Sequence, residues 1–71
     1  MKPLTPDELD CLRALRRRPL RPGPDGFWQS GNPRIYAKDT IDRLAAGGLV
    51  KIAGDGVRLT LRGKVTASFR L

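Results

Sequence analysis

The stretch LAAGGLVKIAGDGVRLTLRGKV, residues 44–65, decides the predicted fold of this chain. Gly47-Gly48 predicts the end of a preceding helix, because glycine adopts left-handed dihedral angles at little cost. Gly54-Asp55-Gly56 separates two short runs in which apolar and polar residues alternate, a pattern typical of a tight hairpin. The stretch therefore predicts a helix end, a β-hairpin over residues 49–60 and another helix after the hairpin.

Alternation along this hairpin predicts one apolar face and one basic face. Apolar residues alternate with Lys51 in the first strand and with Arg58 in the second, so these two side chains are expected to point outward. The apolar members, expected to pack on the helices, are Val50, Ile52, Val57 and Leu59. Thr60 can cap a short last helix over residues 61–69. Its apolar residues recur every four positions as Leu61, Val65 and Phe69.

The N-terminal part of the chain predicts a helix over residues 5–18. Thr5 is a favourable N-cap, Pro6 fits the first helical position, and Glu8 completes a Thr-x-x-Glu capping box. Apolar residues share one face of this helix at helical spacing and are expected to lie in the core: Leu9, Cys11, Leu12 and Leu15. Cys11 is accordingly expected to be a packing residue and not a reactive thiol.

Residues 19–32 are rich in Pro and Gly, which excludes a continuous helix and predicts a loop. Phe27 and Trp28 suit either a short strand that joins the sheet of the hairpin or an aromatic plug under the loop. Trp28 is expected to fill the core and not to stack on a base or ligand.

A second long helix is predicted over residues 33–47, with Asn32 as its cap and Pro33 at its first position. A start near Lys38 or Asp39 is the alternative, because the preceding Ile-Tyr pair also suits a strand.

Residues of the opening stretch match the form L-x-x-x-G-L-V … G-D-G … L-T-x-x-G-K/R, which members of the MarR-like group of winged helix-turn-helix proteins often carry. The matching residues are Leu44, Gly48, Leu49, Val50, Gly54, Asp55, Gly56, Leu59, Thr60, Gly63 and Lys64. The chain resembles this group over roughly its C-terminal half. The resemblance implies an α+β fold, a small winged-helix domain of three helices with a hairpin wing. The usual second helix is degenerate, or replaced by the Pro/Gly-rich loop and a short strand.

The resemblance also implies that the protein binds double-stranded DNA, as a transcriptional regulator or an accessory DNA-binding factor. By analogy, the helix over residues 33–47 is the recognition helix. Its candidate contacts to DNA are Arg34, Lys38, Thr40 and Arg43, and the candidate backbone contacts of the wing and last helix are Lys51, Arg58, Arg62 and Lys64. Asp39 and Asp42 weaken the assignment of this helix as the recognition helix, since the same face can be a solvated surface with ion pairs such as Asp39–Arg43.

Composition favours a single basic domain, residues 1–71, with a polyanionic partner. Fourteen Lys and Arg against seven Asp and Glu give a net charge of +7 and an isoelectric point of about 10.8. With no His and one Cys, we expect no disulfide, soft metal site, cofactor or enzymatic activity. No apolar run approaches the roughly 20 residues that span a bilayer, so a cytoplasmic, nucleoid-associated protein without membrane contact is expected.

The densest positive cluster consists of Arg13, Arg16, Arg17, Arg18 and Arg21, with no acidic residue among them. Complementation of the helix dipole together with solubility explains some of these charges. The functional alternative is a phosphate clamp or a docking patch for an acidic protein. The competing function for the whole chain is accordingly a winged-helix module that binds protein or RNA and ignores duplex DNA.

The oligomeric state has two possible forms. A homodimer on DNA would place two recognition helices in successive grooves. Its candidate pairing residues are Leu61, Val65, Phe69 and Leu71. The same residues can instead close the core of a monomer.

Overall fold

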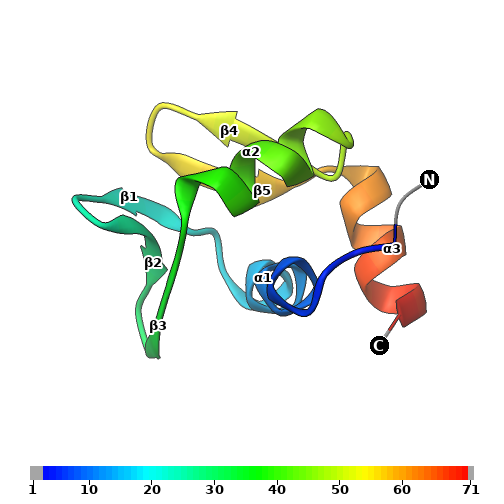
Figure 1. Cartoon of the computed structure of the whole chain (residues 1–71), viewed down its shortest axis with the longest axis horizontal. Helices are drawn as coiled ribbons and strands as arrows, with labels where there is room; N and C mark the ends of the chain where they lie inside the picture. Colours follow the sequence, from blue (N-terminus) through cyan, green and yellow to red (C-terminus); the bar gives the residue numbers. More distant parts are fainter. Residues whose placement is uncertain (1–2, 71) are drawn as a thin grey trace.

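The computed structural model describes residues 3–70 of the chain and the side chains of residues 3–68. The elements follow in the order α1 (Pro6–Arg17), β1 (Arg21–Gly23), β2 (Gly26–Gln29), β3 (Asn32–Tyr36), α2 (Lys38–Ala46), β4 (Val50–Ala53), β5 (Gly56–Leu59) and α3 (Leu61–Arg70). Strands β1, β2 and β3 form one antiparallel sheet, and β4 and β5 form a second. This part of the chain is therefore an α+β fold of three helices and two antiparallel sheets (Figure 1).

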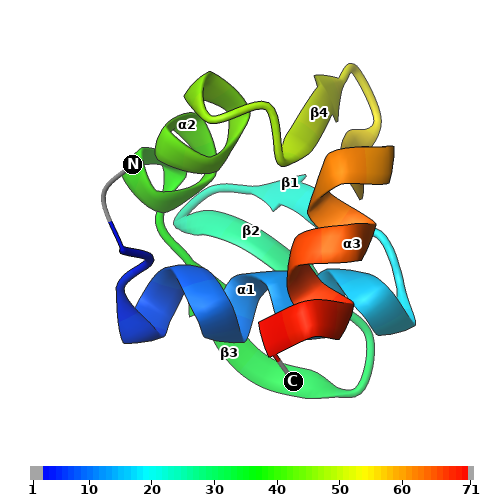
Figure 2. The same ribbon diagram turned by 90° about the vertical axis from the view of Figure 1, so that its right-hand side faces the viewer.

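Helix α1 lies at the centre of the fold. In Figure 1 it stands between the β1–β3 sheet and α3, and Figure 2 shows α3 crossing in front of it. It also packs against α2 and β5. Its buried residues are Glu8, Cys11, Leu12, Ala14 and Leu15, which confirms the predicted apolar face except that Leu9 is only half-buried. The remaining buried apolar residues are Leu20, Tyr36, Ile41, Leu44, Leu49, Val50, Val57 and Ala67.

The predicted capping box at the start of α1 is confirmed. The backbone N–H of Glu8 donates to Thr5 Oγ1 over 3.2 Å, and the N–H of Thr5 donates to Glu8 Oε1 over 3.0 Å. Pro6 occupies the first helical position, where its missing N–H costs no hydrogen bond. The helix ends at Arg17, so the predicted boundaries hold to within one residue at each end.

Residues 19–37 depart most from the sequence-based prediction. The Pro- and Gly-rich stretch forms an antiparallel meander, and its third strand takes up Asn32–Tyr36. The predicted helix start at residue 33 is therefore wrong, and the alternative start near Lys38 is confirmed. Pro33 is tolerated because β3 is an edge strand, where the lack of an N–H donor does not interrupt the sheet.

The predicted strand at Phe27-Trp28 exists as β2, but it pairs with β1 and β3 and does not join the β4–β5 sheet. The two sheets are linked by a bridge between Leu20 and Val57. Leu20 N donates to Val57 O over 3.1 Å, and Val57 N donates to Leu20 O over 2.8 Å. Gly56, with φ +153°, makes this approach possible, since a Cβ there would overlap the Leu20 carbonyl oxygen. The bridge brings the segment after α1 alongside β5.

Helix α3 begins as predicted at the Thr60 cap. Thr60 Oγ1 accepts the N–H of Gly63 over 3.0 Å and donates to the carbonyl of Gly48 over 2.6 Å. Two members of its predicted apolar stripe do not enter the core, however, because Leu61 is 80% and Val65 58% exposed. Of their two predicted roles, closing the monomer core is excluded for these residues. Phe69 and Leu71 lie outside the described side chains.

The β4–β5 hairpin follows the predicted alternation only in part. Val50 and Val57 are buried and Leu59 is partly buried, but Ile52 is 46% exposed near the tip of the hairpin. Gly48 has φ +75°, the left-handed conformation expected where α2 ends. Within residues 3–70, no helix is long and apolar enough to cross a membrane.

Candidate functional site

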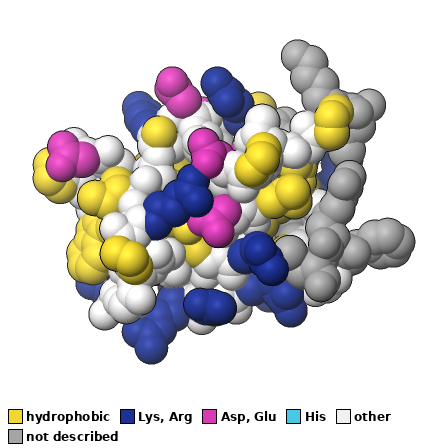
Figure 3. Space-filling view, turned by 60° about the horizontal axis from the view of Figure 1, so that its bottom comes forward, with side chains coloured by type: hydrophobic (Ala, Val, Ile, Leu, Met, Phe, Trp, Pro, Cys, Tyr) yellow, Lys and Arg dark blue, Asp and Glu magenta, His cyan; other side chains and the backbone are white. Residues whose placement is uncertain are grey.

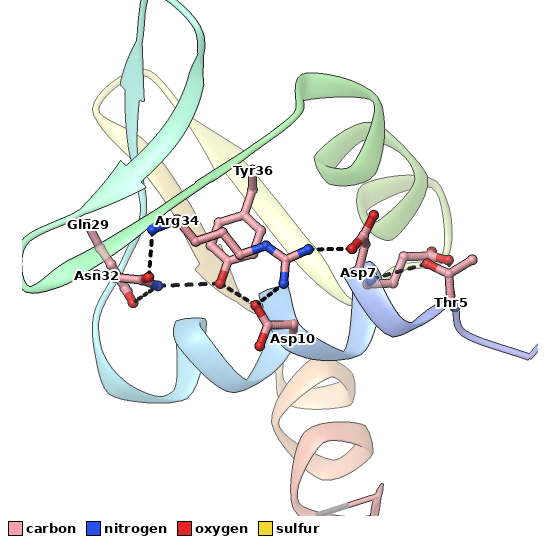
Figure 4. A network of polar contacts seen from close by, with 8 residues as sticks. Thr5, Asp7, Asp10, Gln29, Asn32, Arg34 and Tyr36 are labelled. Carbon is pink, nitrogen blue, oxygen red and sulfur yellow. Dashed lines mark hydrogen bonds and ion pairs between the residues drawn. The ribbon is translucent and has the colours of Figure 1, made fainter.

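Arg34 does not lie on a helix, contrary to its prediction as a recognition-helix contact. It lies on β3, where its NH1 donates to Asp10 Oδ2 over 2.9 Å and its NH2 pairs with Asp7 on α1 (Figure 4). Its Cζ stands 5.4 Å from the centroid of the Tyr36 ring. The hydrogen bond to Asp7 raises the pKa of Arg34 above its usual value. The guanidinium therefore fastens the edge strand to α1, and its charge is already matched.

Gln29 starts a second set of contacts between α1 and the β2–β3 hairpin. Its buried Nε2 donates to the carbonyl oxygens of Ala14 and Arg18, each over 3.1 Å, at the C-terminal end of α1. Its Oε1 accepts from Asn32 Nδ2 over 2.9 Å. The bond to Arg18 supplies a donor to a carbonyl beyond the last turn of α1, and the bond to Ala14 adds a second donor to a carbonyl that already accepts from the N–H of Arg18. They therefore fix the direction in which the chain leaves α1.

The chain of hydrogen bonds continues from Asn32 to α1. Asn32 Nδ2 also donates to Tyr36 Oη over 3.3 Å, and Tyr36 Oη donates to Asp10 Oδ2 over 2.7 Å (Figure 4). Burial raises the pKa of the Tyr36 hydroxyl, so it stays protonated and able to donate. Asp10 thus accepts from both Tyr36 and Arg34. These polar residues therefore hold α1 and the β2–β3 hairpin together.

The exposed face of α2 carries no net charge. Lys38 and Arg43 are exposed as predicted, and Thr40 is half-buried. Ile41 and Leu44 face the core, so helical geometry places Asp39 and Asp42 in the middle of the opposite, exposed face. Without Arg34 the two cations are balanced by the two carboxylates.

The predicted Asp39–Arg43 ion pair is not formed. Among the side chains of residues 3–68, every ion pair involves Arg34.

Five exposed arginines from three elements line two adjoining clefts. We call them the arginine surface: Arg13, Arg17, Arg18, Arg21 and Arg58. The first cleft, of about 600 Å³, lies between α1 and the β2–β3 turn. The second, of about 460 Å³, lies between the end of α1, the β1–β2 hairpin and β5. Arg18, Gln29 and Ser30 line both clefts, so the arginines form one continuous basic surface.

Few acidic groups oppose this charge. The carboxylates that line the two clefts belong to Asp10 and Asp55, and Asp10 is already paired with Arg34. On the face shown in Figure 3, Lys and Arg side chains without acidic neighbours lie along the lower edge, whereas in the centre and the upper part acidic side chains lie beside other Lys and Arg side chains. Arg13 and Arg17 are one helical turn apart, roughly 6 Å along the axis. Successive phosphates could be contacted by side chains at such a spacing.

Trp28 is not a core residue, contrary to its prediction. Its side chain is 40% exposed and lines the second cleft together with Arg18, Arg21 and Arg58. The alternation of β2 explains this, because Gln29 is buried and Trp28 points to the other face of the strand. The order Phe27-Trp28-Gln29 contains this signal, but the alternation can be interpreted only once residues 26–29 are known to form a strand.

The other predicted contacts are distributed over separate surfaces. Lys51 and Arg58 are opposite each other in the β4–β5 register and both are exposed, as the alternation predicted. Arg62 and Lys64 are exposed on α3, and Arg16 is exposed on α1 but lines neither cleft. Of the residues predicted to contact a polyanion, the structure therefore brings together those near the end of α1, Arg21 and Arg58.

Cys11 is fully buried, and burial raises the pKa of its thiol from 9.0 to about 12. It contacts neither cleft, so it belongs to the core and not to the site.

Comparison of the chain with models of protein families, with curated proteins and with solved structures found no significant match.

Proposed function

We propose that the protein binds nucleic acid through the arginine surface, with double-stranded DNA as the first ligand to test. The observation that carries this proposal is the convergence of five exposed arginines from α1, β1 and β5 on adjoining clefts. Arginine suits this role because its guanidinium forms paired hydrogen bonds with phosphate oxygens. The net charge of +7 adds long-range attraction for a polyanion.

The order of elements supports a winged-helix assignment. Helix α2, the β4–β5 hairpin and α3 follow one another as the resemblance implied, and the Leu20–Val57 bridge fastens the hairpin to the segment after α1. The β2–β3 hairpin stands where most members of that family have a second helix. In this proposal the β4–β5 hairpin is the wing, and its Lys51 and Arg58 contact the DNA backbone, with Arg62 and Lys64 adding further contacts.

In this proposal the arginine surface and the exposed face of α2 make different kinds of contact with DNA, because their charges differ. The neutral face of α2 is a poor phosphate binder, so Lys38, Thr40 and Arg43 would contact base edges only after the arginine surface has bound the backbone. Arg34 is left out of the proposed interface, because Asp7 and Asp10 already hold its guanidinium. Binding of this kind suits a regulator or an accessory DNA-binding factor, as a monomer or as a dimer on DNA.

The test is fluorescence anisotropy with random duplex DNA, titrated from about 50 to 200 mM salt. Two double variants remove the same charge from different surfaces: Arg18→Ala with Arg21→Ala, and Lys38→Ala with Arg43→Ala. We expect the first pair to reduce the salt dependence by about 1.8 ion equivalents, at about 0.9 per lost phosphate contact. The second pair is expected to leave the slope unchanged.

Each other outcome has a definite meaning. If the α2 pair lowers the slope and the arginine pair does not, the phosphate contacts belong to α2 and the proposed interface is wrong. If the wild-type protein binds no duplex DNA at the lowest salt, duplex-DNA binding is refuted. The arginine surface would then fit the competing role of a docking patch for an acidic protein.

A further inference from the structure

We infer that the second cleft binds an unpaired nucleobase, stacked on Trp28, with the neighbouring phosphates held by Arg18, Arg21 and Arg58. This inference rests on the proposed function and narrows its ligand to nucleic acid with single-stranded positions. We call this cleft the Trp28 cleft. It is lined by Arg18, Pro19, Arg21, Trp28, Gln29, Ser30, Asp55, Gly56 and Arg58.

The position of Trp28 is the first argument. A large aromatic side chain that is 40% exposed carries a hydration cost that burial would remove. Trp28 nevertheless packs against the sheet. Its indole lies so close to Gly23 that a Cβ added there would be only 2.9 Å from Trp28 Cδ1 and 3.3 Å from Nε1. Glycine at this position lets the indole rest against the backbone of β1. Trp28 is therefore ordered on one side and open to the cleft.

The arrangement of charge around the indole is the second argument. Arg21 is the direct cross-strand partner of Trp28, so both side chains project from the same face of the β1–β2 pair. Arg18 and Arg58 reach the same cleft from the end of α1 and from β5. Basic side chains beside an exposed aromatic ring are the combination by which proteins bind single strands, with phosphates on the cations and bases on the ring.

The size and lining of the cleft are the third argument. Its volume of about 460 Å³ falls within the range of small-molecule pockets. Ser30 and Asp55 also line it and offer a hydroxyl and a carboxylate to the edge of a base. A paired base in a duplex cannot use this site, because its neighbours in the stack cover both of its faces. An unpaired base leaves a face open to the indole.

The chain itself supplies the probe, because Trp28 is its single tryptophan. The experiment compares an oligothymidylate of about 12 nucleotides, a duplex of the same length and an abasic oligomer with the same phosphates. Anisotropy of a labelled oligomer measures binding, and the fluorescence of Trp28 measures stacking. We expect all three to bind with salt-dependent affinity, but only the oligothymidylate to quench Trp28 strongly.

Variants separate stacking from charge. Trp28→Ala should weaken binding of the oligothymidylate about 5- to 150-fold while changing affinity for the abasic oligomer little. Trp28→Phe should recover part of the loss, because phenylalanine keeps a ring on which a base can stack. Ile35→Ala, which shortens an exposed apolar side chain on β3 outside both clefts, is the matched control and should change neither affinity. Circular dichroism confirms that each variant is folded.

The failure of this inference differs from the failure of the proposed function. If all three oligomers bind but none quenches Trp28, or the abasic oligomer quenches it as strongly as the oligothymidylate, base stacking is refuted and phosphate binding stands. If no oligomer binds at low salt, both proposals are wrong. Should Trp28→Ala fail to fold, quenching in the wild-type protein and the affinity of Trp28→Phe still decide the question.

Discussion

Replacement of Gln29 by methionine is the sharpest test of how the basic surface is built. Methionine has nearly the same length and flexibility as glutamine, so the substitution removes hydrogen bonds without opening a large cavity. It removes three hydrogen bonds, those that join Gln29 to the carbonyl oxygens of Ala14 and Arg18 and to the Nδ2 of Asn32. The Ala14 oxygen keeps its bond from the N–H of Arg18, and Asn32 Nδ2 keeps its bond to Tyr36. Only the bond to Ala14 is fully buried, and water can replace the other two in part.

The magnitude follows from these three lost hydrogen bonds. Each contributes about 0.5–1.5 kcal/mol net to the free energy of unfolding, which gives about 2–4 kcal/mol for Gln29→Met. A chain of 71 residues has a folding free energy on the order of 4–10 kcal/mol, so the loss is a large fraction of the total. For a domain of this size, the melting temperature should fall by roughly 10–25 °C.

Thermal melts followed by circular dichroism, together with urea denaturation, measure this loss. The control is Ser30→Ala, the exposed neighbour, which should shift the melting temperature by no more than a few degrees. A Gln29→Met protein with the melting temperature of the wild type would refute the reasoning, because it would mean that the amide does not hold the end of α1 to the β2–β3 hairpin.

Three further outcomes are expected. Gly63→Ala should unfold or strongly destabilise the domain in thermal melts, because a Cβ there would overlap the carbonyl oxygen of Leu49; a melting temperature close to that of the wild type would contradict this packing. The Cys11 thiol is neutral in the folded state up to its pKa of about 12, so unfolding free energy should fall by about 1.4 kcal/mol per pH unit as pH rises above 9.0. Urea titrations should find this alkaline loss in the wild type and a smaller one in Cys11→Ala, whereas equal losses would argue against the burial effect. Arg34→Gln should lower the melting temperature more at about 20 mM than at about 500 mM salt, because salt screens the exposed ion pairs with Asp7 and Asp10. A decrease that does not depend on salt would indicate that the variant loses packing and not an electrostatic interaction.

Local signals in the sequence predicted the starts of α1 and α3, but not the start of α2, because the expected Asn32 cap lies in β3. The Thr5–Glu8 capping box and the Thr60 cap were found from residue types alone, because caps depend on neighbours within one turn. The hairpin around Gly54-Asp55-Gly56 was found for the same reason. These features are decided over three or four residues, so no knowledge of distant contacts is needed.

The middle of the chain could not be predicted in the same way. Pro and Gly in residues 19–32 excluded a helix, but the pairing of β1 with β2 and β3 depends on cross-strand contacts that residue types do not specify. Asn32–Tyr36 fits a helix start as well as a strand by sequence. In the structure the segment is a strand paired with β2, and its Arg34 and Tyr36 both bind Asp10 on α1, which lies 24 and 26 positions earlier in the sequence.

The sequence by itself determined the basic character of the chain, the capped helices, the hairpin and the excess of arginine near residue 18. Net charge depends on composition, and capping depends on residues within one helical turn, so both can be predicted without the tertiary structure. The tertiary structure alone decided which charges remain exposed for a ligand. It matched Arg34 with two carboxylates and brought Arg58 beside Arg18 and Trp28 through the Leu20–Val57 bridge. The candidate site depends on this pairing of strands distant in sequence, because long-range pairing selects the face on which each side chain stands.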